Sequence, residues 1–274
     1  MPPGRLPPLR ELKGPMMRAR LRAAANALYV KRLSAKLAGR PRPRHIGIML
    51  DGNRRWARMA GHDDPSEGYK VGGAKVVDFL NWCGSAGIEH VTLFMLSDDN
   101  LHRPQAELVP LIGIIEDVVE RLAAPDNPWP VEVIGSLDLL PQESATRLKQ
   151  AASRTSDRRD GTRVDVAVGY GGRREIVDAV RSAMSEHVTQ GGDIEGLIDT
   201  FDVDHISKHL YSKVRSETDL IIRTSGEQRL SGFLLWQSAY AEVHFCECYW
   251  PDFRELDFLR ALRSYCERER RYGR

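Results

Sequence analysis

Three short stretches of the sequence concentrate side chains that can bind an anion or a metal ion. They are DGNRRW at residues 51–56, SDDNLHRP at residues 97–104 and RTSGEQRLSG at residues 223–232. Carboxylates are hard oxygen ligands that suit Mg²⁺, and arginine guanidinium groups bind phosphate oxygens through paired hydrogen bonds. Each stretch also follows a short apolar run. Together they predict a site for a phosphorylated ligand.

The first stretch has two interpretations. Gly52 permits a sharp turn that opens backbone N–H groups to an anion, and Asp51 is a candidate Mg²⁺ ligand beside two phosphate-binding arginines, Arg54 and Arg55. In the alternative, Asp51 caps a helix and both arginines lie on a solvated face. These residues alone leave both interpretations open.

The other two stretches differ in how strongly they indicate a site. Residues 97–103 supply a hydroxyl, two acids, an amide and a guanidinium, but by themselves they favour a capped, hydrophilic strand-to-helix turn. Residues 223–232 are long and polar for a connector. Arg223 and Arg229, with nearby hydroxyl groups, predict an anion-binding loop there.

Alternating strand and helix patterns predict a single α/β domain with a mostly parallel sheet flanked by helices. The candidate strands are His45–Leu50, Val91–Leu96, Val131–Ile134, Val164–Val168, Leu220–Arg223 and Glu242–Phe245. The candidate helices are Met16–Leu37, Tyr69–Ala86, Pro104–Leu122, Pro141–Ser153, Arg173–His187, Val203–Leu210 and Asp252–Arg270. Ligands of such sheets bind beyond the carboxyl ends of the strands, where the three polar stretches begin.

Composition excludes several classes of protein. The 274 residues are 42% hydrophobic and 28% charged, which is unlike collagen, a disordered chain or a disulfide scaffold. No apolar run approaches the roughly 20 residues that span a bilayer, and the first residues lack the apolar core of a secretory signal. We therefore expect a cytoplasmic protein. The cysteines suit a reducing compartment, and Cys246 with Cys248 is better read as two thiols than as a zinc site; they are Cys83, Cys246, Cys248 and Cys266.

Positive charge is concentrated at the start of the chain. Residues 1–44 hold twelve Lys or Arg residues against Glu11, whereas residues 45–274 carry a net charge of −9. Prolines predict that residues 1–15 do not fold alone, and a basic helix is expected to follow. This extension either contacts an anionic membrane surface or is a solvated tail. A nucleic-acid partner is not expected, because the rest of the chain is acidic and lacks an aromatic and basic surface.

Five ordered motifs resemble those of the cis-prenyltransferases, the Z-isoprenyl diphosphate synthases that include undecaprenyl diphosphate synthase. They are HIGIMLDGNRRWA, LSDDNLHRP, VAVGYGGRREIVDAV, DLIIRTSGEQRLSGFLLWQSAYAE and WPDF…DFLRAL. The resemblance covers residues 45–274, the expected catalytic domain, and residues 1–44 lie outside it. It implies a homodimer with a six-stranded parallel sheet, a hydrophobic tunnel and a need for Mg²⁺. The implied reaction adds isopentenyl diphosphate to an allylic diphosphate and forms a cis double bond.

The resemblance also implies roles for individual residues. Asp51 and Glu242 are expected at the Mg²⁺ site, and Asn100 is expected to assist proton removal, although an amide is a poor base and the released pyrophosphate is the alternative acceptor. Residues expected to bind the allylic substrate are Gly52, Asn53, Arg54, Arg55 and Trp56. Residues expected to bind isopentenyl diphosphate are Ser97, Arg103, Arg223, Arg229 and Ser231. Further residues expected to bind substrate are Tyr69, Asp98, Asp99 and Leu230.

Departures from the long-chain pattern predict a short product. Arg54 occupies a position that is usually Gly, Tyr69 ends an altered stretch, and Met95 replaces a small residue at the tunnel. Actinobacterial short-chain Z-farnesyl diphosphate synthases are similar in the last two respects. We expect one condensation on geranyl diphosphate to (2Z,6E)-farnesyl diphosphate. The alternatives are a C50–C55 polyprenyl carrier and an inactive partner subunit or lipid-binding scaffold. Four intact residues argue against the scaffold: Asp51, Arg223, Arg229 and Glu242.

Overall fold

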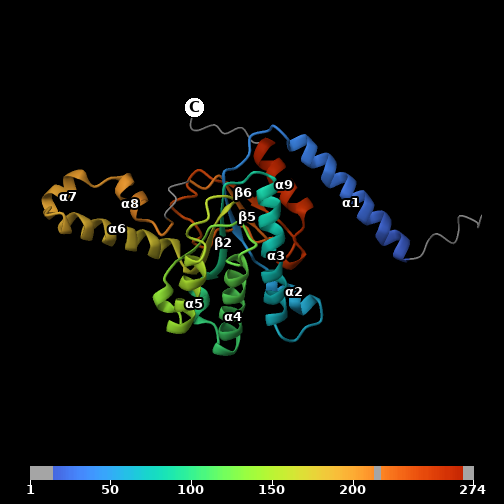
Figure 1. Cartoon of the computed structure of the whole chain (residues 1–274), viewed down its shortest axis with the longest axis horizontal. Helices are drawn as coiled ribbons and strands as arrows, with labels where there is room; N and C mark the ends of the chain where they lie inside the picture. Colours follow the sequence, from blue (N-terminus) through green and yellow to red (C-terminus); the bar gives the residue numbers. More distant parts are fainter. Residues whose placement is uncertain (1–14, 213–216, 268–274) are drawn as a thin grey trace, which may run out of the picture. The chain divides into compact units, whose positions relative to one another are not determined.

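The computed structural model describes residues 15–212 and 217–267. They belong to two compact units. The larger unit is formed by residues 42–253 and contains the sheet and the three polar stretches (Figure 1). The second unit combines residues up to Pro41 with residues from Arg254 onward, so the last helix groups with the N-terminal helix.

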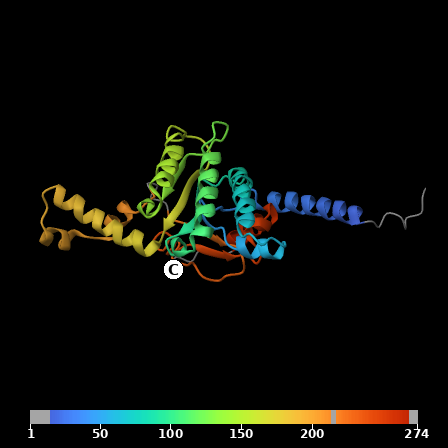
Figure 2. The same cartoon turned by 90° about the horizontal axis from the view of Figure 1, so that it is seen from below.

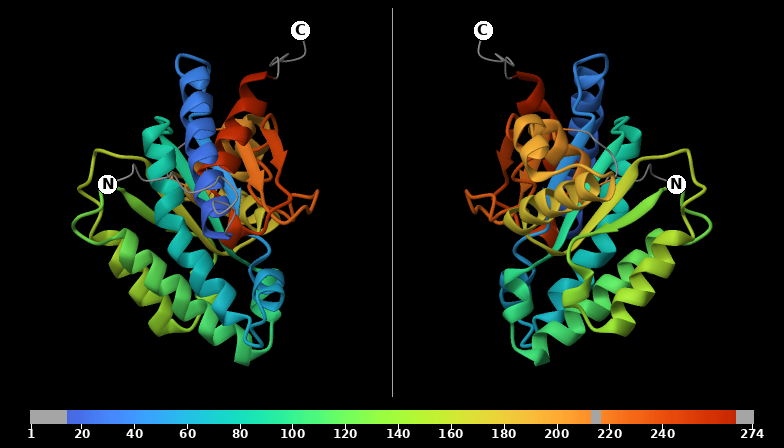
Figure 3. Two further views of the ribbon diagram at one scale, coloured as in Figure 1. Left: turned by 90° about the vertical axis from the view of Figure 1, so that its right-hand side faces the viewer. Right: turned by 90° about the vertical axis from the view of Figure 1, so that its left-hand side faces the viewer.

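The larger unit is built on one six-stranded sheet in which every strand pair is parallel (Figure 3). The strand order is β3-β4-β2-β1-β5-β6. The bounds are β1 His45–Met49, β2 His90–Ser97, β3 Val131–Ile134, β4 Arg163–Tyr170, β5 Leu220–Arg223 and β6 Glu242–Phe245. The predicted fold class is confirmed, and predicted strand ends differ from these by at most two residues.

Strand β1 lies at the centre of the three polar stretches because its neighbours in the sheet are β2 and β5. All five of its residues are buried, as expected for a strand covered on both faces. Its last residue, Met49, pairs with Phe94 of β2 and with Arg223 of β5. The polar stretches after β1, β2 and β5 therefore start at three adjacent strand ends.

Three helices pack side by side on one face of the sheet (Figures 1 and 2). They are α3 (Ser66–Ser85), α4 (Gln105–Leu122) and α5 (Gln142–Ser153). Their buried side chains include Phe79, Leu80, Ile115 and Leu148, which form part of the core. The short elements near them are α2 (Asn53–Met59), η1 (Asp99–His102), η2 (Leu137–Leu139) and η3 (Trp250–Asp252).

Helices α6 (Gly172–Thr189), α7 (Ile194–Thr200) and α8 (Val203–His209) form an arm that extends from the sheet (Figures 1 and 2). The ion pair between Glu186 and Lys208 links α6 to α8. Helix α7 was not predicted; it is a short helix in which Leu197 is the buried residue. Large apolar side chains are exposed on this arm: Val177, Met184, Val188, Ile194, Ile198 and Val203.

The second unit pairs helix α1 (Pro15–Leu37) with helix α9 (Glu255–Glu267). Leu33 is buried in this unit, and the Cys266 thiol donates a hydrogen bond to the Pro41 carbonyl at 3.0 Å. The predicted basic helix is confirmed. The prediction for residues 1–14 falls outside the described residues, as do residues 268–270 of the predicted last helix. None of the helices described by the structure is both long and apolar enough to cross a membrane.

Candidate active site

A cavity of about 630 Å³ opens where β1, β2 and β5 end. This volume is typical of small-ligand sites. The cavity has a polar part formed by the loops after the strands and an apolar part bounded by α3 and α4. The predicted residues that line it are Asp51, Gly52, Asn53, Arg54, Arg55, Tyr69, Met95, Ser97, Asp99, Asn100, Arg103, Arg223, Arg229 and Ser231.

Asp51 is held by both neighbouring elements. Its Oδ1 accepts a hydrogen bond from the Gly52 backbone N–H at 2.8 Å, and its Oδ2 accepts one from Arg223 Nη2 at 2.8 Å. Gly52 has a φ of 98°, a left-handed conformation that favours glycine, and a Cβ there would lie 2.6 Å from the Tyr249 ring. The turn therefore fixes the carboxylate at the cavity while α2 begins at the next residue.

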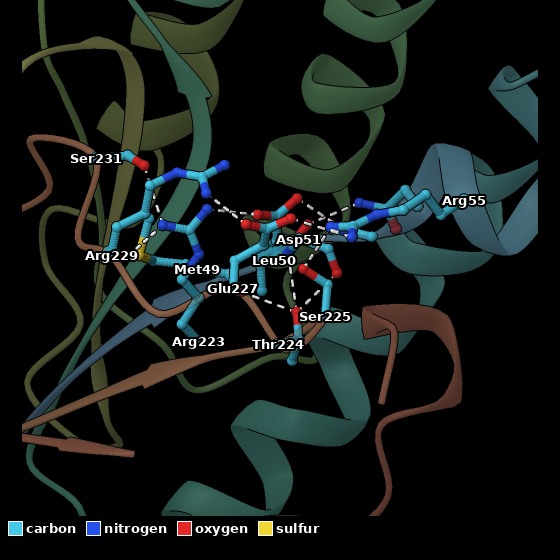
Figure 4. Close-up of polar contacts among 12 residues, drawn as sticks. Met49, Leu50, Asp51, Arg55, Arg223, Thr224, Ser225, Glu227, Arg229 and Ser231 are labelled. Atoms are coloured by element: carbon cyan, nitrogen blue, oxygen red, sulfur yellow. Dashed lines mark hydrogen bonds and ion pairs between the residues drawn. The ribbon is translucent and has the colours of Figure 1, made fainter. Parts of the chain in front are cut away.

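The loop after β5 is fastened to the loop after β1. The Thr224 hydroxyl accepts a hydrogen bond from the Asp51 N–H at 2.9 Å. It donates to the Asp51 carbonyl at 2.7 Å, with the Met49 carbonyl at 3.1 Å as a second acceptor. Arg223 donates from Nη1 to the Arg229 carbonyl and to the Ser231 hydroxyl. Figure 4 shows Arg223 and Arg229 on one side of the Asp51 carboxylate and Arg55 on the other. Arg223 pairs with Asp51, whereas Arg55 and Arg229 both pair with a second carboxylate, that of Glu227.

Glu227, Ser225 and Tyr249 position Arg55. Arg55 donates to the Ser225 hydroxyl at 2.7 Å and to Glu227 Oε1 at 3.1 Å (Figure 4). Its guanidinium carbon also lies 5.5 Å from the centre of the Tyr249 ring. Glu227 also pairs with Arg229. Roles for Ser225, Glu227 and Tyr249 were not predicted. Glu227 and Ser225 lie within the third polar stretch, whereas nothing in the sequence near Tyr249 indicates its contact with Arg55.

The second polar stretch brings its own arginine to the cavity. The Ser97 hydroxyl accepts a hydrogen bond from the Asn100 N–H at 3.1 Å at the start of η1. Arg103 Nη1 donates to the Tyr69 hydroxyl at 2.7 Å and to Glu107 Oε1 at 2.9 Å. Burial, and the hydrogen bond to the Glu107 carboxylate, raise the pKa of Tyr69 well above its ordinary value. Tyr69 is therefore a neutral donor at physiological pH.

A β-bulge places Met95 in the cavity wall. In the pairing of β2 with β4, Phe94 lies opposite Ala167 and Leu96 lies opposite Val168, which leaves Met95 as the extra residue. Successive side chains in a regular strand alternate between faces, but a bulge re-aims one of them. Phe94 and Met95 accordingly both line the cavity, together with Leu111, Ile114 and Ile115 of α4.

Comparison with known proteins assigns this arrangement to a family. The family model described as putative undecaprenyl diphosphate synthase matches residues 48–273. The chain belongs to the cis-prenyltransferase family. The expected enzyme class is thereby confirmed.

Named relatives and a solved structure agree with this assignment. The chain is 76% identical to isoprenyl transferase 2 of Streptomyces coelicolor, over 94% of this chain and 100% of that protein. It is 52% identical to the (2Z,6E)-farnesyl diphosphate synthase of Mycolicibacterium smegmatis, over 93% of this chain and 98% of that protein. The structure resembles lavandulyl diphosphate synthase from Lavandula x intermedia in complex with dimethylallyl diphosphate, with a TM-score of 0.77 and 33% identity over 85% of this chain and 98% of that one.

Three residues predicted to bind substrates in this cis-prenyltransferase do not line the cavity. Trp56 donates from Nε1 to Asp252 at 2.9 Å, and Leu230 packs against the hydrophobic core. Asp98 accepts a hydrogen bond from the Asp99 N–H at 2.9 Å and caps η1, as in the alternative interpretation of that stretch. In this structure these side chains contact neighbouring loops and the core outside the cavity lining.

Glu242 lies away from Asp51 within the chain. It is the first residue of β6 and pairs with Leu220, whereas Phe245 pairs with Arg223 at the cavity end. Glu242 and Phe245 are three residues apart along the strand, which is a distance of about 10 Å. The structure does not bring Glu242 to the cavity of its own chain, and its role at a metal site stays a prediction.

The donor set at Asp51 fits a Mg²⁺–diphosphate complex. Each carboxylate oxygen of Asp51 accepts one hydrogen bond, and the side chain is 38% exposed, so both oxygens retain lone pairs beside the cavity. In residues 15–212 and 217–267, no three His, Cys, Asp or Glu side chains gather closely enough to hold a metal. Mg²⁺ is commonly bound by one or two carboxylates together with substrate phosphates. A site of this kind needs no further protein carboxylate.

Proposed function

We propose that this cis-prenyltransferase condenses isopentenyl diphosphate once with geranyl diphosphate to give (2Z,6E)-farnesyl diphosphate. The observation that carries the proposal is the position of Met95, which lines the apolar part of the cavity beside Phe94. A methionine there fills space that a growing chain would need, and overpacking is not relieved at low cost. The names of the relatives from Mycolicibacterium smegmatis and Thermobifida fusca support the same product.

The donor diphosphate binds at the loop after β1. The backbone N–H groups at the start of α2 and the side chains of Arg54 and Arg55 supply positive charge there. Departure of pyrophosphate leaves an allylic cation, so the barrier depends on stabilising the charge that develops on the leaving group. These groups are already in place before reaction, and Asp51 joins them as the Mg²⁺ ligand. Bound Mg²⁺ supplies further charge neutralisation at the diphosphate.

Isopentenyl diphosphate binds at a second anchor formed by the loops after β2 and β5. Arg103, Arg229 and Ser231 line that side of the cavity, and Arg223 holds the loop that carries the last two. Two anchors on adjacent strand ends hold the two substrates close together, which lowers the entropic cost of their reaction. Asn100 lines the same region and orients the substrate, while the released pyrophosphate accepts the proton.

The proposal includes assembly and location. The enzyme acts as a homodimer in the cytoplasm, and the apolar side chains exposed on α6, α7 and α8 support association through the arm. Helix α1 contacts the anionic membrane surface. Its sequence contains no acidic residue, and its exposed side chains include Leu28, Tyr29, Lys31 and Lys36.

Product sizing tests the proposed function. Purified full-length enzyme is incubated with labelled isopentenyl diphosphate and Mg²⁺, with either geranyl or farnesyl diphosphate as donor, and the dephosphorylated alcohols are separated by length. We expect one C15 product from geranyl diphosphate. A ladder that reaches C50–C55 would instead establish the long-chain alternative. No product from either donor would favour the partner-subunit or scaffold alternative.

A further inference from the structure

One carboxylate connects arginines from both substrate anchors. Glu107 lies in the first turn of α4, and its Oε1 accepts hydrogen bonds from the Tyr69 hydroxyl at 2.8 Å and from Arg103 Nη1 at 2.9 Å. The same oxygen lies 3.5 Å from Arg54 Nη1. Arg54 belongs to α2, Tyr69 to α3, and Arg103 to the segment before α4. A single oxygen atom therefore joins three elements.

Glu107 lies behind the groups that it contacts. Arg54, Tyr69 and Arg103 line the cavity, whereas the Glu107 side chain is 14% exposed and does not line it. Arg103 uses Nη1 for both Tyr69 and Glu107, which leaves its Nε and Nη2 as donors for a diphosphate. The contact thus fixes the direction of a guanidinium group without using all of its hydrogen-bond donors.

Electrostatics alone would disfavour a carboxylate at this position. A negative charge beside a diphosphate site raises the free energy of the bound anion, and the interaction strengthens where water is excluded. Glu107 also offsets part of the positive charge of Arg54 and Arg103. Its presence is explained if orientation of the two arginines contributes more to substrate binding than its charge costs.

We propose that Glu107 is a positioning residue that holds Arg54 and Arg103 at a fixed separation, and that Tyr69 extends this hold to Arg103. The proposal rests on the proposed function, because it assigns Arg54 to the donor diphosphate and Arg103 to isopentenyl diphosphate. The Tyr69 hydroxyl hydrogen-bonds to Glu107 and Arg103 but not to Arg54. Its removal is therefore expected to affect one substrate only.

Steady-state kinetics of full-length variants test whether removal of Glu107 raises or lowers the KM of each substrate. We expect Glu107→Ala to raise KM about tenfold for both substrates, equivalent to about 1.4 kcal/mol for each. Tyr69→Phe raises KM for isopentenyl diphosphate alone. Glu107→Gln loses the charge that faces both arginines but keeps an acceptor oxygen for Tyr69 and Arg103. Arg54 is held only by the ion pair at 3.5 Å, so KM is expected to rise more for the donor than for isopentenyl diphosphate. A purely electrostatic role predicts the opposite sign, a lower KM after the charge is removed.

Glu120→Ala is the matched control. Glu120 lies on the same helix and pairs with Arg154 away from the cavity, so its loss is expected to leave both KM values unchanged. Unchanged or lowered KM values in Glu107→Ala would overturn the proposal, as would equal effects of Tyr69→Phe on both substrates. If the alanine variant does not fold, Glu107→Gln decides the question: a KM that rises more for the donor than for isopentenyl diphosphate supports the proposal, and any other outcome overturns it.

Titration with inorganic pyrophosphate separates this proposal from the proposed function. Pyrophosphate affinity depends on the arginines and not on turnover. Weaker binding by Glu107→Ala, with no product from the wild-type enzyme, would support positioning and contradict the proposed substrates. Unchanged pyrophosphate binding alongside normal wild-type product formation would overturn the positioning role alone.

Discussion

Arg223 donates a hydrogen bond from Nη2 to Asp51 Oδ2 at 2.8 Å and thereby joins the ends of two adjacent strands. The arginine side chain is only 3% exposed, whereas that of Asp51 is 38% exposed. A buried guanidinium therefore fixes the direction of a carboxylate that still faces the cavity. This pair holds the carboxylate that we propose as a Mg²⁺ ligand at a defined place relative to the loop after β5.

Replacement of Asp51 is expected to abolish product formation. Asp51→Ala removes the oxygen ligand at the donor diphosphate and with it several kcal/mol of charge stabilisation in the transition state. Turnover is measured with labelled isopentenyl diphosphate, and circular dichroism checks the fold. Asp78→Ala, which removes an exposed carboxylate on α3, is the control. Retention of more than about a tenth of wild-type turnover would contradict the assignment, since tenfold is only about 1.4 kcal/mol.

Met95 is expected to limit the length of the product. Met95→Ala shortens the side chain at the apolar wall, so the enlarged cavity admits a longer prenyl chain and products beyond C15 appear. The readout is the length of the dephosphorylated alcohols formed from geranyl diphosphate. Leu139→Ala in η2 is the control, because Leu139 is exposed and does not line the cavity. An unchanged C15 product from Met95→Ala would show that other residues set the length.

Most of the fold could be predicted because parallel strands covered on both faces are short, apolar and bounded by polar turns. Strands β3, β5 and β6 have the predicted bounds, and the polar stretches do meet at one edge of the sheet. The order of the strands is a tertiary property. Only the structure places β1 between β2 and β5 and so makes the stretches neighbours.

Individual site residues were predicted less well where their role depends on the direction in which the side chain points. Alternation along β2 places Met95 and Phe94 on opposite faces, and the bulge that brings both to the cavity leaves no sign in the sequence. Trp56 lies in the first polar stretch, yet it points to Asp252, far along the chain. Glu107 lies outside the three polar stretches and was not predicted, because its partner Tyr69 comes from another helix.

Stability is expected to fall in acid because of Asp165. Burial raises the pKa of its carboxyl, but hydrogen bonds from His90 and Ser212 outweigh burial and lower the pKa below its ordinary value. His45, which is stacked on His90, adds to this lowering of the pKa. Since the folded pKa is the lower one, the stabilisation is complete above the unfolded pKa of about 4 and is lost as pH falls through the folded pKa.

Urea unfolding between pH 6 and pH 3 measures this contribution. The free energy of unfolding of the wild-type protein is expected to fall more steeply below about pH 4 than that of Asp165→Asn, which has no carboxyl to protonate. Asp138→Asn, at an exposed position in η2, is the control and should follow the wild type. Parallel curves for Asp165→Asn and the wild type would exclude Asp165 as the source of acid sensitivity.

Helix α1 is expected to bind anionic membranes weakly. Its exposed basic side chains attract acidic headgroups, each contributing about 1 kcal/mol near the surface, while Leu28 and Tyr29 are exposed for contact with the lipid boundary. Substitution of Lys31, Arg32 and Lys36 by Gln in the full chain should therefore reduce cosedimentation with vesicles that contain anionic lipid. The matched control replaces three basic residues by Gln that are exposed on the larger unit, namely Arg121, Lys149 and Arg159. Because the attraction is electrostatic, binding of the wild type should also weaken as salt increases. Equal sedimentation of wild type and the α1 variant would show that the basic helix is a solvated extension without a membrane role.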